Sequence, residues 1–244
     1  MIPWLDADTP FPDTRRALGP GSEAPGLLAA GGGLGTARLR QAYRQGIFPW
    51  FSEGQPVLWW STAPRMVLPV SEFKVSRSLR KTLRKFALSP THEIRVDHAF
   101  DQVVTMCAGT ERQGQRGTWI LPEMQHAYRA WHRQGDVHSF ETWAHGQLVG
   151  GLYGVCQGRM FYGESMFSHQ TDASKIALAA LVWFCKKNGI ELIDCQQETS
   201  HLESLGARPW PREHFEEHLR RVVDLPPPVE WSYDASEWLT DQPL

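Results

Sequence analysis

The sequence predicts an α+β fold, in which a small N-terminal α+β domain precedes a larger domain with a mixed, mainly antiparallel sheet flanked by helices. Two observations predict this class. Three strand-like runs separated by short turns have the pattern of consecutive hairpins: VHSFETWA (137–144), QLVGGLYGVC (147–156) and RMFYGESMF (159–167). A helical segment at 172–187 and the strand-like run ELIDCQ (191–196) then return the chain to the same sheet.

The N-terminal domain is predicted from its turns and aromatic runs. Residues 1–35 are rich in Pro and Gly, and the GGG at 31–33 is predicted to be a turn because no complete phosphate-loop sequence accompanies it. A helix is expected to begin at Thr36, a suitable N-cap, and to stop at Gly46. Two aromatic-rich strands follow within IFPWFSEGQPVLWWSTAPRMVLP (47–69).

Helices are predicted on either side of the hairpin strands. Helical patterns cover 76–86, 100–107, 118–131 and 212–223. The third of these has an amphipathic pattern, which predicts packing against the sheet. We expect domains at 1–70 and 71–230, followed by a C-terminal tail at 231–244.

Composition indicates an ordinary globular protein with a surplus of tryptophan. The chain is 41% hydrophobic and 21% charged, and it has no apolar run that could span a membrane. Its four cysteines form no CxxC pair, which favours reduced thiols and a cytoplasmic location. The net charge of −2 does not indicate binding to nucleic acid. The 11 Trp residues, however, favour aromatic surfaces on which bases stack.

Three polar residues stand inside apolar strand-like runs and are the first candidates for a site. They are Glu164, Asp194 and Gln196. A buried carboxylate needs a partner or a chemical task. On a regular strand Asp194 and Gln196 point to the same face, because they are two residues apart. The alternative is a structural hydrogen-bond cluster within the sheet.

The helix at 76–86 has one strongly basic face. Its cations are spaced at i, i+3, i+4, i+7 and i+8, and they are Arg77, Arg80, Lys81, Arg84 and Lys85. Leu79, Leu83 and Phe86 form the opposite face. The pattern predicts a phosphate backbone as partner, and a solvated surface face is the alternative.

Other motifs are ambiguous or are better explained by packing. Trp50, Trp59, Trp60 and Trp119 lie beside turn residues or glycines, where a ring is either core or a stacking platform. HFEEH (214–218) matches a zinc-protease pattern, but its helix has an apolar stripe that favours packing, so we expect no metal. Cys195 is expected to be an inert buried thiol.

The chain closely resembles the bacterial leucyl/phenylalanyl-tRNA–protein transferases. Matching blocks run in order along nearly the whole chain: PGLLAAGGGL (25–34), AYRQGIFPWFSEGQPVLWWS (42–61), SRSLRK (76–81), TWI (118–120), HSFETW (138–143), LVGGLYGV (148–155), FYGESMF (161–167), ASKIAL (173–178), LIDCQ (192–196) and HLESLGA (201–207). One departure is STAPR at 61–65, where the family usually has SPDPR, and the tail beyond Pro226 matches little.

The resemblance implies an activity, a fold and a set of site residues. Members of this family transfer Leu or Phe from tRNA to proteins that begin with Arg or Lys, and the transfer marks these acceptor proteins for regulated degradation. The larger domain of the family members is similar to the GNAT fold. It implies stacking of the terminal adenosine on Trp50 and Trp119, and catalysis by Asp194 and Gln196. Candidates for an apolar amino-acid pocket, which should accept Leu, Phe and Met, are Leu152, Phe161, Gly163, Met166 and Ile193.

Sequence leaves the division of chemical roles open. An α-amine has a pKa of about 7.7–8.0 against about 3.9 for Asp, so an ordinary aspartate is a poor proton acceptor. Either Asp194 polarises Gln196, whose carbonyl oxygen accepts a hydrogen bond from the amine, or burial raises a carboxylate's pKa. Glu164 is a candidate for binding the acceptor's cationic side chain.

Two other classes of protein are alternatives. A CoA-dependent N-acetyltransferase would need a pyrophosphate loop, which the sequence lacks, and a non-catalytic tRNA-binding protein would use the basic helix and the tryptophans alone. We therefore expect no cofactor, aminoacyl-tRNA and protein substrates as partners, no membrane association and a monomer.

Overall fold

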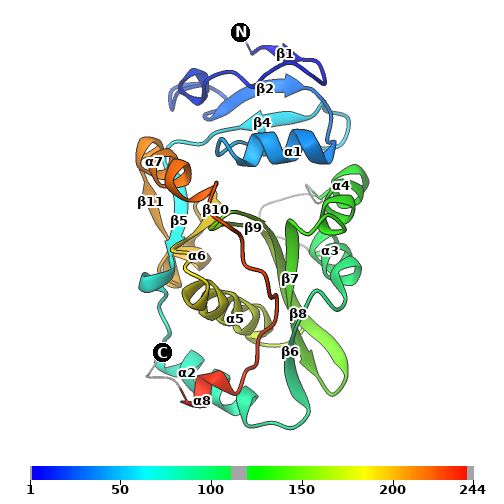
Figure 1. Cartoon of the computed structure of the whole chain (residues 1–244), viewed down its shortest axis with the longest axis vertical. Coiled ribbons are helices and arrows are strands. Elements are labelled where there is room, and N and C mark those ends of the chain that lie inside the picture. The colour runs from blue at the N-terminus through cyan, green and yellow to red at the C-terminus, as the bar shows by residue number, and fades with distance from the viewer. Residues whose placement is uncertain (1, 111–119, 241–244) are drawn as a thin grey trace.

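The computed structural model describes residues 2–110 and 120–240, and within these residues it contains two β-sheets (Figure 1). The smaller sheet lies at the N-terminal end of the molecule with the strand order β1-β2-β4-β3. Its strands are β1 (Trp4–Leu5), β2 (Leu27–Gly31), β3 (Phe48–Pro49) and β4 (Leu58–Trp60). Helix α1 (Thr36–Tyr43) has Gly35 at its N-cap, so the prediction of Thr36 as the cap is wrong by one residue. Glycine is itself a favourable N-cap residue.

The larger sheet has, within the described ranges, the strand order β11-β5-β10-β9-β8-β7-β6. Its strands are β5 (Arg65–Pro69), β6 (His92–Val96), β7 (Val137–Ala144), β8 (Gln147–Gln157), β9 (Met160–Ser168), β10 (Leu192–Gln196) and β11 (Arg208–Trp210). The three predicted hairpin strands form its antiparallel centre, and β10 pairs parallel to β9. The predicted fold class, a small α+β unit followed by a larger mixed sheet with helices, is confirmed.

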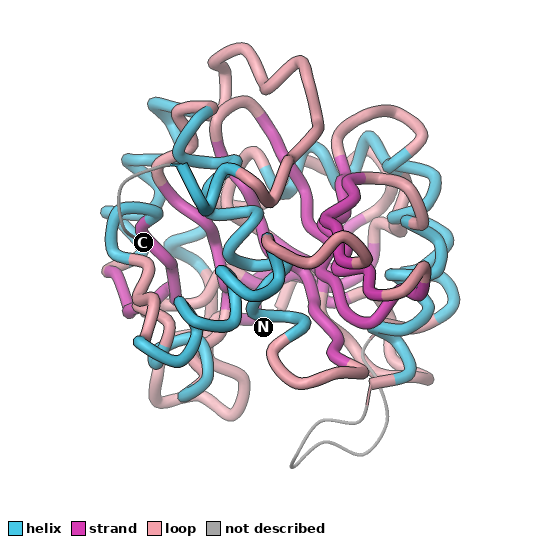
Figure 2. Tube along the Cα trace, turned by 90° about the horizontal axis from the view of Figure 1, so that it is seen from below, coloured by secondary structure: helices cyan, strands magenta, loops and turns pink. Residues whose placement is uncertain are grey.

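Helices lie on both faces of the larger sheet. After α1, the helices of the described residues are α2 (Arg77–Ala87), α3 (Phe100–Gly109), α4 (Pro122–His132), α5 (Ala173–Lys187), α6 (Ser200–Ser204), α7 (Arg212–Val222) and α8 (Glu237–Thr240), and 3-10 turns are at Thr14–Arg16 and Val70–Glu72. Helix α5 packs on β7, β8 and β9, α3 packs on the same three strands, and α4 packs on β7. Figure 1 shows α5 on one side of these strands and α3 and α4 on the other. Figure 2 shows the strands in the middle of the molecule with helices on both sides. No helix within 2–110 and 120–240 is long and apolar enough to cross a membrane.

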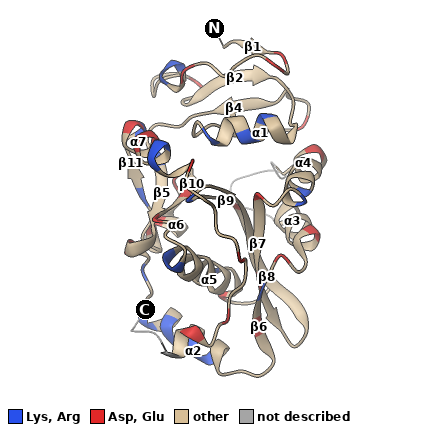
Figure 3. Cartoon of the chain, viewed as in Figure 1, with Lys and Arg blue, Asp and Glu red and all other residues tan. Residues whose placement is uncertain are grey.

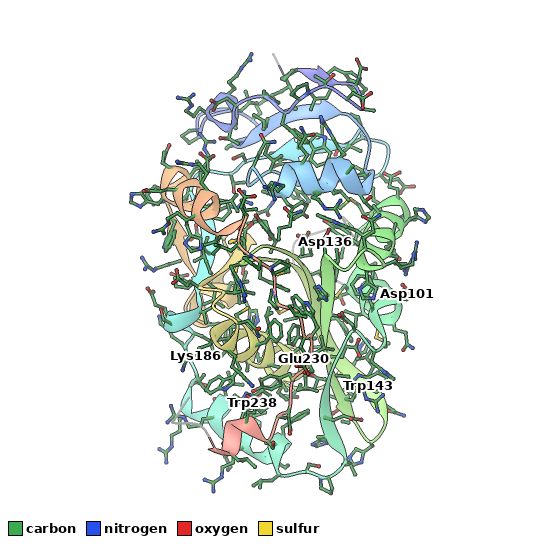
Figure 4. The ribbon with its side chains drawn as sticks, viewed as in Figure 1. Asp101, Asp136, Trp143, Lys186, Glu230 and Trp238 are labelled. Atoms are coloured by element: carbon green, nitrogen blue, oxygen red, sulfur yellow. The ribbon has the colours of Figure 1, made fainter. Side chains whose placement is uncertain are left out.

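Within the described residues, two large hydrophobic clusters form most of the core, and a small third one contains Ala144, Val149 and Ala173. The first joins the N-terminal sheet to the α3 and α4 face, so that Leu5 and Trp59 share one cluster with Trp131. The second lies under α5 and includes the C-terminal residues Tyr233 and Trp238. Figure 4 shows Trp238 near α2, where its ring lies 6.0 Å from that of Phe86.

The junction between the two sheets also carries polar contacts. Asp136, labelled in Figure 4, lies between α1 and the larger sheet. Its carboxylate accepts hydrogen bonds from Arg40 Nε at 3.0 Å and from Trp131 Nε1 at 2.7 Å. The domain boundary at residue 70 and the tail from residue 231 stay predictions; β5, which precedes residue 70, pairs with β10 and β11 of the larger sheet.

Candidate active site

The candidate site lies where the strands β9 and β10 of the larger sheet stop pairing, a place that we call the opening between these strands. These parallel strands pair at two positions, the second of which joins Tyr162 to Asp194. Beyond it each strand carries a bulge, with Glu164 as the extra residue on β9 and Cys195 as the extra residue on β10. Residues 163–166 of β9 are partly exposed, although the strand lies inside the sheet. Bulges re-aim side chains and are common beside active sites.

Asp194, one of the two predicted catalytic residues, is fully buried and forms an ion pair with Arg65. Arg65 Nε donates to Oδ1 at 2.8 Å, and Nη2 donates to Oδ2 at 2.7 Å. The guanidinium lies between the rings of Phe48 and Phe215, 4.7 Å from each ring centroid. The pair balances two buried charges, but it leaves Asp194 without a surface that a substrate could touch.

Gln196, the other predicted catalytic residue, is partly exposed and has left-handed backbone geometry, with φ of 55°. Its N–H donates to Asp194 Oδ1 at 3.0 Å. Its side-chain NH2 donates to the carbonyl oxygens of Gly163 and Cys195, both at 3.0 Å, so the amide oxygen points away from these two carbonyls. The assumption of a regular strand from Asp194 to Gln196 is wrong, because the bulge at Cys195 interrupts it.

Glu164 belongs to a ring of three hydroxyl and carboxyl groups. The hydroxyl oxygens of Tyr43 and Tyr128 lie 2.8 Å from Oε1 and Oε2 of Glu164, and 2.6 Å from each other. Each hydroxyl has one hydrogen, so an ionised Glu164 leaves one of the three contacts without a hydrogen. A protonated Glu164 supplies the third hydrogen and completes the ring.

The electrostatic environment of Glu164 agrees with this count of hydrogens. Burial raises the pKa of Glu164 to about 7, although hydrogen bonds from Tyr43 and Tyr128 act in the opposite direction. The negative charge of Asp194 also raises it. The carboxylate with a raised pKa is therefore Glu164, which the sequence could not specify.

The tryptophans divide into core and partly exposed residues. Trp59 and Trp60 are buried, and their Nε1 groups donate to the carbonyl oxygens of Gly31 and Trp50. Both are therefore core residues and not stacking platforms. Trp50 is partly exposed and packs edge-on against Trp60, with 5.2 Å between ring centroids. Trp119 lies outside the described residues.

The five residues predicted to form the amino-acid pocket come from β8, β9 and β10. Leu152, Phe161 and Ile193 are buried in the cluster under α5. Met166 is partly buried against the same cluster, and Gly163 is partly exposed. A Cβ added at Gly163 would meet no atom closer than 3.6 Å, so this position leaves room beside β10.

The basic helix α2 begins with a capped turn, because Ser76 Oγ accepts a hydrogen bond of 3.1 Å from Leu79 N–H. Its apolar face is buried, and its five predicted cations are all exposed. Among residues 2–110 and 120–240, no carboxylate lies within ion-pair distance of Arg77, Lys81, Arg84 or Lys85. A groove of about 360 Å³ is lined by Lys81, Arg84, Lys85, Leu88, Ser89 and His92. Figure 3 shows α2 at the opposite end of the molecule from the N-terminal sheet.

Three further residues of this site are not among those predicted from the sequence: Arg65, Tyr43 and Tyr128. Arg65 had a usable signal, because it is a charged residue at the start of the apolar run RMVLP. The tyrosines had none beyond their place on helical apolar stripes.

The fold and the site together define a class of α+β protein. Its carboxyl and amide groups gather at the opening between β9 and β10, and a basic helix lies apart from them. The family model described as leucyl/phenylalanyl-tRNA protein transferase matches residues 67–220, and the model of the N-terminal domain of that family matches residues 32–63. The chain belongs to the leucyl/phenylalanyl-tRNA–protein transferase family.

Curated relatives with that name cover nearly the whole chain. One from Leptothrix cholodnii is 66% identical over 241 residues, which are 98% of this chain and 94% of that protein. One from Methylibium petroleiphilum is 64% identical over 239 residues, 98% of this chain and 90% of that protein. Among solved structures, FemX is 10% identical with a TM-score of 0.44, over 71% of this chain and 66% of that chain.

Proposed function

We propose that this protein transfers Leu or Phe from aminoacyl-tRNA to the α-amine of proteins that begin with Arg or Lys. Family membership and the names of the near-full-length relatives support this reaction. The observation that carries it is the partly exposed Gln196 amide, which contacts Gly163, the neighbour of Glu164. An amide and a carboxyl group thus flank one opening in the sheet.

The donor is held at two separate places. The terminal adenosine stacks on Trp50 and Trp119, and the exposed cations of α2 contact the tRNA backbone without reading its sequence. The donor side chain enters beside Gly163 and Met166, with Leu152, Phe161 and Ile193 behind them. An apolar pocket separates side chains mainly by size, so Met is a further donor.

The chemistry needs no ATP because an aminoacyl ester is already activated. The acceptor nitrogen attacks the ester carbonyl carbon, a C–N bond forms, and the bond from that carbon to the ribose oxygen breaks. The ribose leaves as a hydroxyl that carries the proton given up by the amine. Gln196 Oε1 accepts a hydrogen bond from the attacking amine and orients it.

Glu164 binds the cationic side chain of the acceptor's first residue. In its ionised form Glu164 lacks one hydrogen for its ring with Tyr43 and Tyr128, and a guanidinium or ammonium N–H supplies a further donor. Ionised Glu164 therefore favours Arg or Lys over a neutral residue. The product is an extended N-terminus that marks the acceptor for regulated degradation, in a reaction that we place in the cytoplasm and assign to a monomer.

The test uses purified protein, radiolabelled Leu-tRNA and two peptides that differ only in an N-terminal Arg or Ser. We expect label on the Arg peptide alone, without ATP or acetyl-CoA. Tight tRNA binding without transfer would contradict the proposal and favour a tRNA-binding protein. Acetylation of the peptide from acetyl-CoA would contradict it in favour of an N-acetyltransferase.

A further inference from the structure

We propose that Arg65 is a positioning residue of this reaction: through Asp194, it fixes the backbone turn that presents the Gln196 amide to the acceptor amine. The inference rests on the proposed function for its activity readout, but its structural readout is independent of that function. In this view Gln196 touches the substrate, and Arg65 and Asp194 act through it.

The surroundings of Arg65 exclude direct contact with a substrate. The side chain is 1% exposed, and it lies between the rings of Phe48 from β3 and Phe215 from α7. Both planar N–H groups that face Asp194 are used in the two-point ion pair. Arginine suits this place because its flat guanidinium stacks on rings and matches a carboxylate at two points, which lysine cannot do.

Asp194 passes the constraint from Arg65 to Gln196. Its Oδ1 accepts hydrogen bonds both from Arg65 Nε at 2.8 Å and from Gln196 N–H at 3.0 Å. The second bond closes over Cys195, the extra residue of the bulge. It fixes Gln196 in the left-handed region, an uncommon geometry for a residue other than glycine.

The position of the Gln196 amide depends on this turn. Its NH2 donates to the carbonyl of Gly163 on β9, which spans the opening between the two strands. A displacement of about 1 Å in a reacting group can reduce a rate by about 10²-fold. We therefore expect loss of Arg65 to slow the chemical step and to leave tRNA binding unchanged.

This arrangement also assigns the role of Asp194. The carboxylate is fully buried and accepts hydrogen bonds from Arg65 and from the Gln196 backbone. No exposed atom of this carboxylate is left to contact the attacking amine. Asp194 is then a positioning residue that holds the turn.

The experiment compares Arg65→Met, Arg65→Lys and the double variant Arg65→Met/Asp194→Leu. Arg65→Met leaves a buried charge unpaired and risks unfolding, whereas the double variant removes both charges and keeps an apolar interior. For each variant we measure the single-turnover transfer rate at saturating Leu-tRNA, the tRNA dissociation constant, and hydrogen exchange of the Gln196 backbone amide by NMR. Arg208→Met is the matched control, because Arg208 on β11 makes a two-point pair with Glu72 that is exposed to solvent.

We expect the folded double variant to transfer about 10²-fold more slowly with an unchanged dissociation constant and faster exchange at Gln196. Arg65→Lys should recover part of the rate and part of the exchange protection. A double variant with the wild-type rate, or with wild-type protection of the Gln196 amide, would overturn the proposal. If the wild type itself transfers nothing, the proposed function fails, while the exchange data still decide whether Arg65 positions Gln196.

Discussion

The hydroxyl of Tyr43 on α1 donates a hydrogen bond of 2.8 Å to Glu164 on β9, a residue 121 positions further along the chain. This bond joins the N-terminal unit to β9, the central strand of the larger sheet. Tyr162, two residues before Glu164, donates from its hydroxyl to the backbone carbonyl of Tyr43 at 2.7 Å. Residues near the start of the chain therefore help to build a site whose acid and amide groups, Glu164, Asp194 and Gln196, lie in the second half.

Stability should fall as pH rises through the titration of Glu164. Its pKa is about 7 in the folded protein against an ordinary 4.5, so the folded state binds more protons than the unfolded state between these values. The favourable contribution is complete below pH 4.5 and is lost as pH rises to about 7. In urea unfolding, the free energy of unfolding of Glu164→Gln should rise relative to that of wild type by about 1–3 kcal/mol as pH increases through this window. Above the window the difference between the two proteins should stay constant.

A variant at an exposed acid is the control for this measurement. Glu123→Gln on α4 removes a carboxylate that is exposed to solvent. Its stability difference from wild type should not change between pH 4.5 and 7. Equal pH dependence for the two variants would contradict a specific role of Glu164 burial.

Acceptor binding should improve as pH rises through the same range. Ionised Glu164 attracts the cationic side chain, and with a pKa of about 7 its ionised fraction increases about tenfold from pH 6 to pH 8. The KM for an Arg-initiated peptide should therefore fall by about tenfold over that range. Glu164→Gln should raise the KM and abolish this part of the dependence, and a peptide beginning with citrulline, which is neutral, should show none of it. If the KM of Glu164→Gln depends on pH as that of wild type does, the cationic side chain of the acceptor does not bind at Glu164.

Helix α2 should contribute to tRNA affinity and not to the chemical step. The triple variant Arg77→Gln/Lys81→Gln/Arg84→Gln should weaken tRNA binding and make the affinity less sensitive to salt, by about 0.9 in the logarithmic slope for each phosphate that is no longer neutralised. Transfer from leucyl-adenosine, which has no tRNA backbone, should keep the wild-type rate. The matched control replaces three other exposed cations, Arg16, Arg133 and Arg220, with Gln. Equal loss of tRNA affinity in the two triple variants would contradict a specific role of α2, because it would show that only the net charge of the protein matters.

Trp50 should contribute to binding of the donor's terminal adenosine. Loss of a stacked base costs about 1–3 kcal/mol, so Trp50→Ala should raise the KM for leucyl-adenosine about 5-fold to 150-fold. Trp4→Ala is the control, because Trp4 is 66% exposed on β1 of the same N-terminal sheet. A normal KM in Trp50→Ala would remove this ring from the donor site.

The centre of the fold could be predicted because it is built from local pairings. Strands β7, β8 and β9 follow one another through short turns, which leave a readable pattern. No local pattern predicts β6 and β11, because each is short and pairs with a strand far from it in sequence. Trp59 looked as accessible as Trp50 beside its turn, and it is the packing of the N-terminal sheet that buries it.

The polar residues of the site could be predicted, but their connections could not. Glu164 and Asp194 stood out as acids in apolar runs, and the same rule applied to Arg65 would have indicated an ion pair. The bulge at Cys195 depends on how β10 registers against β5, which no local pattern specifies. Likewise, Tyr43 and Tyr128 reach Glu164 only because α1 and α4 pack against each other beside β9.

The most direct test of the proposed chemistry is single-turnover transfer of labelled Leu from Leu-tRNA to an Arg-initiated peptide, by wild type and by Gln196→Ala. We predict transfer by the wild type without ATP, and a rate at least about 10²-fold lower in the variant with unchanged tRNA affinity. Equal rates in the two proteins would contradict the placement of the chemistry at the opening between β9 and β10.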